Sequence, residues 1–145
     1  MIFIFTFGVN GAIINKNINI KSDSVEFIEQ LNQISFQNNV EIDSDNIVIK
    51  ADSAIYDNSE DLISFIGMPT TIKSEEKEVG FSGTAQKILF YNDEKIHLIG
   101  NAYMQYEVKQ TLDTGSSKYP ISYKLRMNED GWKIINIIIN GVNLG

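Results

Sequence analysis

The sequence contains no cysteine, one histidine and two prolines among its 145 residues. Without cysteine it has no disulfide framework, no thiolate ligand for zinc or an iron–sulfur cluster, and no cysteine nucleophile. With His97 as the single histidine, a metal site built from several histidines is excluded, although a Ser-His-Asp triad is still formally possible. Composition therefore argues against most classes of enzyme, and we expect no cofactor and no catalytic residue.

Basic side chains are also scarce. The chain has 12 basic and 19 acidic side chains, so its net charge is −7. Phosphate contacts need clustered Lys and Arg, so we expect no nucleic-acid partner. The apolar fraction of 43%, with 8 Phe and 6 Tyr spread along the chain, is enough for a folded core. The charge is uneven: residues 1–107 hold 7 basic and 16 acidic side chains, and residues 108–145 hold 5 and 3. This asymmetry suggests two origins within one chain.

The first twelve residues, MIFIFTFGVNGA, are apolar and too short to span a bilayer, which takes about 20 residues. Two interpretations are open. Residues 1–16 are either the remnant of a secretory signal peptide that ends near Ala12, or they contain an apolar first strand.

From Ile18 onward, apolar and polar residues alternate with the period of a half-buried β-strand. Short strands are expected around 18–21, 34–36, 40–42, 47–51, 63–65, 88–90 and 96–98. Turn-forming residues separate them, namely Asn38-Asn39, Asp43 to Asn46, Asp57 to Ser59, Met68-Pro69 and Asn92-Asp93. Residues 24–31 fit either a helix or, as we favour, a strand followed by a turn at Glu29-Gln30. The pattern predicts an all-β fold of antiparallel strands.

An internal repeat with an offset of 29 residues connects 20–27 with 49–56, and 34–36 with 63–65. A looser third copy begins at Phe81. Each copy is predicted to contain two strands with a tight turn and then a strand that leads onward, and a unit of this size is too small to bury its own apolar face. The copies must therefore stack into a shared core and leave strand edges that can accept another chain.

The residues of the repeat resemble the LptA (OstA-like) family of lipopolysaccharide-transport proteins. The resemblance covers residues 17–107 and is carried in order by INIKSD at 18–23, IVIKAD at 47–52, GMPTT at 67–71, GTAQ at 83–86 and LIGNAY at 98–103. It implies a twisted antiparallel β-jellyroll whose apolar interior holds acyl chains and whose protomers join edge to edge.

The C-terminal part is similar to a different family, the MlaC (Ttg2, toluene-tolerance) phospholipid carriers. This resemblance is carried over 119–144 by YPISYKLR, DGWKIIN and GVNL. Read without the family, 119–145 is a β-hairpin with strands at 119–127 and 132–139. The chain therefore resembles a fusion of two shortened proteins joined by a linker at 108–118, and we hypothesise that the hairpin replaces the last strands of the roll.

The resemblance and the alternation together predict which side chains contact lipid. Positions that match lipid-contacting strands of the LptA-like family are Ile18, Ile20, Ile72 and Phe90. Alternation alone adds Phe36, Phe65 and Leu98, for which a closed core is the alternative. His97 is expected to face solvent and Trp132 to pack in the core. No metal-binding residue is predicted.

The predicted function is non-enzymatic, and the predicted location is the periplasm of a Gram-negative cell. There the protein would bind the lipid A acyl chains of lipopolysaccharide and relay them through β-edge association with itself and with other jellyroll domains. One alternative is a phospholipid carrier of the MlaC type. The other is a structural adaptor that joins jellyroll domains by their edges and holds no lipid.

Overall fold

The computed structural model describes residues 3–7, 18–92, 95–128 and 130–145 of the chain. The structure is built from strands and one short 3₁₀ helix, and the predicted all-β fold is confirmed. The elements are β1 (Phe3–Phe7), β2 (Ile18–Ser22), β3 (Ser24–Ile28), η1 (Glu29–Leu31), β4 (Gln33–Ser44), β5 (Ile47–Asp57), β6 (Leu62–Glu75), β7 (Val79–Tyr91), β8 (Ile96–Ile99), β9 (Tyr103–Asp113), β10 (Lys118–Asn128), β11 (Gly131–Ile139) and β12 (Val142–Asn143).

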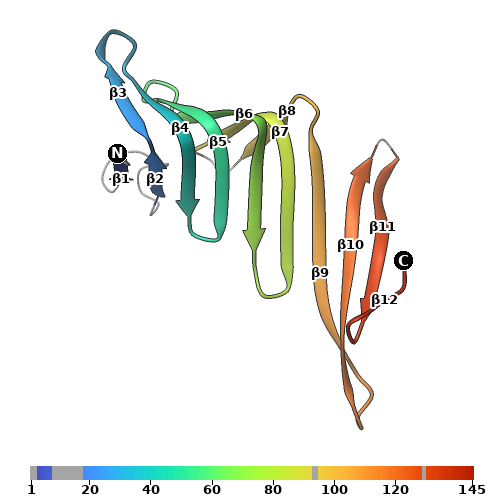
Figure 1. The fold of residues 1–145 in the computed structure, drawn as a ribbon. Helices are drawn as coiled ribbons and strands as arrows, with labels where there is room; N and C mark the ends of the chain where they lie inside the picture. The colour runs from blue at the N-terminus through green and yellow to red at the C-terminus, as the bar shows by residue number, and fades with distance from the viewer. Residues whose placement is uncertain (1–2, 8–17, 93–94, 129) are drawn as a thin grey trace. The chain divides into compact units, whose positions relative to one another are not determined.

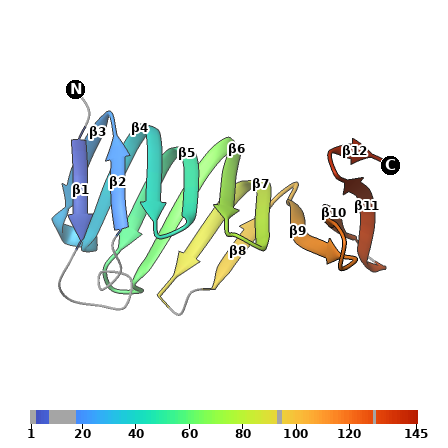
Figure 2. The ribbon, with the colours of Figure 1, turned by 90° about the horizontal axis from the view of Figure 1, so that it is seen from below.

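Hydrogen bonds join the strands into one sheet in the order β1-β2-β4-β5-β6-β7-β9-β10-β11-β12. β3 pairs with β4, and β8 pairs with β7, beside this path. Figures 1 and 2 show β2, β4 and β5 as neighbouring strands. Most neighbours are consecutive in sequence, which is what short turns between alternating strands produce. Among the described residues, no helix is long and apolar enough to cross a membrane.

The chain divides into two compact units. Unit 1 comprises residues 1–72 and 84–102, and unit 2 comprises residues 73–83 and 103–145. The names unit 1 and unit 2 are used in this sense below.

The first two copies of the internal repeat pair with β4 at equivalent positions, one copy on each side of this strand. Ile20 and Ile49 both lie opposite Ile42, one on each side of β4, and both belong to the 29-residue offset. In the same way, Phe27 and Tyr56 both lie opposite Ile34. β2 and β3 together therefore follow the same course as the single strand β5. The predicted stacking of the copies takes place through strand pairing.

Two predicted turns are wrong, because they are bends inside continuous strands. Asn38 and Asn39 have φ angles of 61° and 50°, and they interrupt the register between β4 and β5 without ending either strand. Two residues of β4 oppose one residue of β5 here, which makes a β-bulge and bends the strand. Met68-Pro69 likewise lies within β6. Turn-forming residues were correctly identified there, but the strand continues through them.

The buried positions change parity in the middle of the long strands of unit 1. β5 buries Ile49 and then Ala54, and β7 buries Ala85 and then Ile88. In a straight strand, an odd spacing would place such residues on opposite faces. Both halves are nevertheless buried, so the strand must bend or bulge at the change for each half to face the same interior. This interior is the core of unit 1.

Unit 2 contains the predicted C-terminal hairpin and further strands. β10 and β11 pair from Ile121–Ile139 to Asn128–Gly131, with one irregularity between Lys124 and Leu125. The segment at 108–118, expected as a linker, continues β9 to Asp113 and begins β10 at Lys118, and these two residues pair across the turn. Thr114 closes that turn through its backbone N–H and hydroxyl, both of which donate to the Ser117 carbonyl. Most of the predicted linker at 108–118 therefore belongs to the paired strands β9 and β10.

Two ambiguous segments have strand structure. Residues 24–28 form β3, and η1 follows at the predicted turn, so the strand interpretation of 24–31 is confirmed. Residues 3–7 form β1, which pairs with β2. This is the first strand that was one of the two interpretations of the N-terminus. Residues 1–2 and 8–17, including Ala12, lie outside the described part of the chain.

Candidate functional site

Six of the seven side chains predicted to contact lipid are buried in unit 1. Ile18, Ile20, Phe36 and Phe65 are 0% exposed, and Ile72 and Phe90 are 1% and 3% exposed. Leu98 is half-buried and lies opposite the buried Ile88. All seven belong to unit 1, and those on β2, β4 and β7 face its interior.

The interior of unit 1 is closed in this conformation. A side chain that is fully removed from water has no free surface for a ligand, so hydrocarbon reaches it only after neighbouring side chains move apart. Equally buried residues that we did not single out are Val40, Ile42, Ile49, Ile63 and Ile88. Alternation already identifies Val40, Ile42, Ile63 and Ile88, because each has the parity of a chosen residue on its own strand, whereas no residue was chosen on β5, the strand of Ile49.

The polar groups within this interior are small hydroxyls bonded to nearby protein atoms. The Ser22 hydroxyl donates to the Ser24 carbonyl at 2.9 Å, and Thr70 Oγ1 donates to the Gln86 carbonyl at 3.4 Å. Among the described residues, the buried polar side chains are serines and one threonine, with no charged group. The interior therefore offers an acyl chain apolar contacts and no buried ionic anchor. Lys21, beside the buried Ile20 on β2, is exposed.

A cluster of polar side chains surrounds the Tyr56 hydroxyl at the turn between β5 and β6. The Tyr56 hydroxyl lies 3.1 Å from the Asp61 carboxylate, to which it donates, and 3.3 Å from the Asn58 side-chain oxygen. Burial and then the Asp61 charge raise the pKa of Tyr56 to about 12. Nearby, the side-chain amide of Gln33 donates to Asp57 at 2.9 Å, and with the backbone N–H groups of Glu60 and Ser59 it lowers the pKa of that carboxyl. These bonds order the turn between β5 and β6.

Unit 2 carries a second apolar surface, and this one is not buried. Directly opposed residues of antiparallel strands share a face, so the register of the strand pairs assigns side chains to the two faces of β9, β10 and β11. One face, here called the apolar face, consists of Met104, Tyr106, Val108, Gln110, Leu112, Tyr119, Ile121, Tyr123, Leu125, Met127, Trp132, Ile134, Ile137 and Ile139. None of these residues is buried. The surface was missed in the sequence, although the alternation of 119–127 already indicates it.

Aromatic rings lie close together on the apolar face. The ring centroids of Tyr106 and Trp132 are 4.8 Å apart with an edge-to-face geometry, and those of Phe81 and Tyr106 are 5.7 Å apart. Trp132 is 47% exposed, so the expectation that it packs in the core is wrong. The sequence showed correctly that Trp132 begins a strand, but not that its side chain is left half exposed on the apolar face.

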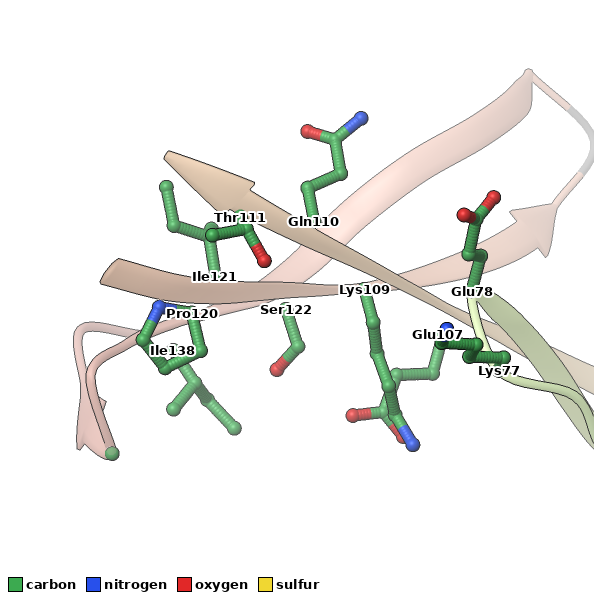
Figure 3. Close-up of a pocket in the computed structure, with 11 residues that line it drawn as sticks. Lys77, Glu78, Glu107, Lys109, Gln110, Thr111, Pro120, Ile121, Ser122 and Ile138 are labelled. Carbon is green, nitrogen blue, oxygen red and sulfur yellow. The ribbon is translucent and has the colours of Figure 1, made fainter. Parts of the chain in front are cut away.

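The opposite face of the same strands, here called the polar face, holds a hollow of about 820 Å³. Figure 3 shows Glu107, Lys109 and Ser122 on this side of the strands and Gln110 on the other. Lys77 and Glu78 also line the hollow, so its basic and acidic side chains are balanced. Pro120, Ile121 and Ile138 line it as well, so the hollow offers both charged and aliphatic side chains.

The remaining candidate chemistry is sparse. His97 is exposed, as expected, and its ring lies 4.9 Å from the ring of Tyr91. Within the described ranges, no group of three or more His, Asp or Glu side chains is placed to hold a metal ion.

Comparison with known proteins supports both predicted resemblances. A model of the MlaC protein family matches residues 77–145, which begins well before the predicted start at Tyr119. The chain is similar in fold to the crystal structure of LptH, the LptA homologous periplasmic component of the conserved lipopolysaccharide transport device from Pseudomonas aeruginosa. That similarity has a TM-score of 0.54 at 13% identity, and it covers 77% of this chain and 76% of LptH. No curated protein matches the chain.

The two comparisons confirm that the chain has an LptA-like jellyroll fold and an MlaC-like C-terminal region. At 13% identity, the likeness to LptH concerns the fold alone.

Proposed function

We propose that this chain is a non-enzymatic periplasmic lipid-binding protein that takes up the acyl chains of lipopolysaccharide inside unit 1 and relays them to neighbouring jellyroll domains. The observation that carries the proposal is the uncharged, apolar interior of unit 1 in a chain with an LptH-like fold. Each methylene that leaves water contributes about 0.8 kcal/mol, so apolar contacts are sufficient for binding.

The proposed lipid contacts are Ile18, Ile20, Phe36, Phe65, Ile72, Phe90 and Leu98. Because the first six are buried in the absence of lipid, uptake requires the interior to open. Leu98 is the one that already has free surface, on the short strand β8 beside β7. We therefore place the first contact with lipid at Leu98. Relay would use the ends of the strand order, β1 and β12, as edges for pairing with another jellyroll.

The test is site-specific photo-crosslinking in a Gram-negative periplasm. A photoreactive amino acid at Leu98 should form an adduct with lipopolysaccharide, because this side chain faces the interior. The matched control is the same amino acid at His97, which is exposed on the other side of β8. Equal adducts at both positions, or none at either, would contradict binding inside unit 1. Native mass spectrometry with lipid extraction identifies the adduct.

A phospholipid carrier is the second candidate, and the match of residues 77–145 to the MlaC family favours it. Phospholipid in place of lipopolysaccharide on the purified protein would support this alternative. Oligomers that join by their strand edges and hold no lipid would support the third possibility, a structural adaptor.

A further inference from the structure

Unit 2 is a single sheet layer with one strongly apolar face. Thirteen of the fourteen residues on the apolar face are aliphatic, aromatic or methionine, and the exception is Gln110. Leu112, Met127 and Ile134 on this face are 50%, 48% and 57% exposed. In the described part of β9 to β12, no residue is buried. A sheet with one apolar face is stable in water when a second layer covers that face.

The apolar face has about the smallest area that a specific interface needs. Three strands spaced about 4.8 Å apart, each about ten residues long at about 3.3 Å per residue, give roughly 500 Å² in projection. This lies in the range of the largest apolar patch on a typical monomer, which is often functional. Two such faces packed together bury roughly 1,000 Å² in total, which reaches the lower limit of a specific protein–protein interface.

The charge distribution indicates what the second layer is. All seven charged residues of β9, β10 and β11 lie on the polar face, namely Glu107, Lys109, Asp113, Lys118, Lys124, Arg126 and Lys133. Unit 2 as a whole has seven basic and seven acidic side chains, whereas unit 1 has five and twelve. A matching partner must be apolar, uncharged and of similar area. The described surface of this molecule offers one such partner, which is the apolar face of another copy.

We propose that two copies of this chain pack their unit 2 sheets face to face through the apolar face, forming a two-layer sandwich. Sheets in such sandwiches lie about 10 Å apart, with their side chains interdigitated. The ring cluster of Phe81, Tyr106 and Trp132 lies on the covered side and supplies the aromatic anchors that interfaces favour. The hollow on the polar face stays open to solvent. This interface differs from edge-to-edge relay, because it uses no strand edge.

Sedimentation velocity of the full chain after removal of bound lipid tests the proposal. The wild type should be a dimer that dissociates on dilution. Added salt should favour the dimer, because it screens the net charge of −7 on each copy and leaves apolar contacts intact. A monomer at all protein concentrations would overturn the proposal.

A matched pair of variants identifies the face. Ile134 and Lys133 are neighbours on β11 with 57% and 53% exposure, but they lie on opposite faces. Ile134→Ser should raise the dimer dissociation constant by at least roughly tenfold, since each interface loses the side chain twice. Lys133→Ser should leave it unchanged. Dimers equally stable in both variants would be formed through another surface and would refute the proposal.

Cysteine crosslinking gives a second measurement that does not depend on affinity. Because the chain has no cysteine, a single one can be introduced without a background reaction. With a bismaleimide of about 10 Å span, Ile134→Cys should crosslink two copies and Lys133→Cys should not. A photoreactive amino acid at position 134 that formed a lipid adduct on a monomer in the periplasm would overturn the proposal and assign the face to lipid. Neither result changes the test at Leu98, so this inference and the proposed function can fail separately.

Discussion

Unit 1 and unit 2 are both built from antiparallel strands with alternating apolar residues, but unit 1 encloses a core and unit 2 does not. The difference lies in the middle of the strands. In unit 1 the buried parity changes within β5, β6 and β7, and Asn38 and Asn39 bulge β4. In unit 2, β9 and β10 pair over nine consecutive positions without a shift in register. Alternation therefore produces an apolar face in both units. In unit 1 the strands bend, so that the two halves of the sheet cover each other's apolar face.

The comparison predicts a large difference between the two units when an aromatic side chain is removed. Phe36→Ala in unit 1 should lower the free energy of unfolding by about 3–5 kcal/mol, because it leaves a cavity in a fully buried site. Trp132→Ala in unit 2 should cost about 1 kcal/mol or less in the monomer, because nearly half of the side chain is already in water. Denaturant titration at low protein concentration measures both. Losses of equal size would show that unit 2 has a core of its own.

A smaller effect is expected from the buried Tyr56 hydroxyl of unit 1, which donates to Asp61. The folded pKa of Tyr56 is about 12 and its ordinary value is 10.0, so the folded state disfavours ionisation. The associated stability is fully present below pH 10 and is lost as the pH rises through about 12. The loss is at most about 2–3 kcal/mol by linkage.

Tyr56→Phe tests this contribution, because it removes the titrating hydroxyl. The variant should therefore lose less stability than the wild type between pH 10 and about 12. Asp61→Asn removes the nearby charge and should fall between the two proteins. Parallel pH curves for wild type and Tyr56→Phe in alkaline denaturation would contradict the assignment of this group.

The smallest contrast concerns two glycines with left-handed backbone, Gly100 in unit 1 and Gly141 in unit 2, at φ 80° and 82°. A methyl group at Gly100 would meet the side chain of Gln86, whereas nothing lies within 4 Å at Gly141. Gly100→Ala should cost about 2 kcal/mol and Gly141→Ala about 1 kcal/mol, which is the backbone penalty alone. Thermal unfolding of both variants measures the difference. A larger loss at Gly141 would mean that this turn is more crowded than it is in this structure.

Most strands of this protein could be predicted from the sequence, because a period of two depends only on local order. The 29-residue repeat also predicted correctly that Ile20 and Ile49 are equivalent, and both pair with Ile42. The errors at Asn38-Asn39 and at Met68-Pro69 have one cause. These residues favour unusual backbone geometry wherever they stand, and sequence does not tell whether the strand ends there or bends and continues.

The sequence predicted the apolar side of the strands that carry the candidate lipid contacts, and lipid contact itself stays a prediction. The residues chosen for lipid contact do face one side of their strands, but their burial depends on strands that come from distant parts of the sequence. Trp132 shows that sequence also cannot tell which apolar side chains are left exposed. Its aromatic ring predicted a core position, yet the single layer of unit 2 leaves it half exposed.

Local sequence is enough to predict the strand periodicity, the repeat, the C-terminal hairpin and the separation of apolar from charged residues along each strand. These properties follow from the identity of neighbouring residues. Which apolar faces are covered depends on the arrangement of the strands in space, because burial requires a second layer. In unit 1 the bends within β4 to β7 supply that layer. In unit 2 no such bend brings one, so its apolar face is left for a partner.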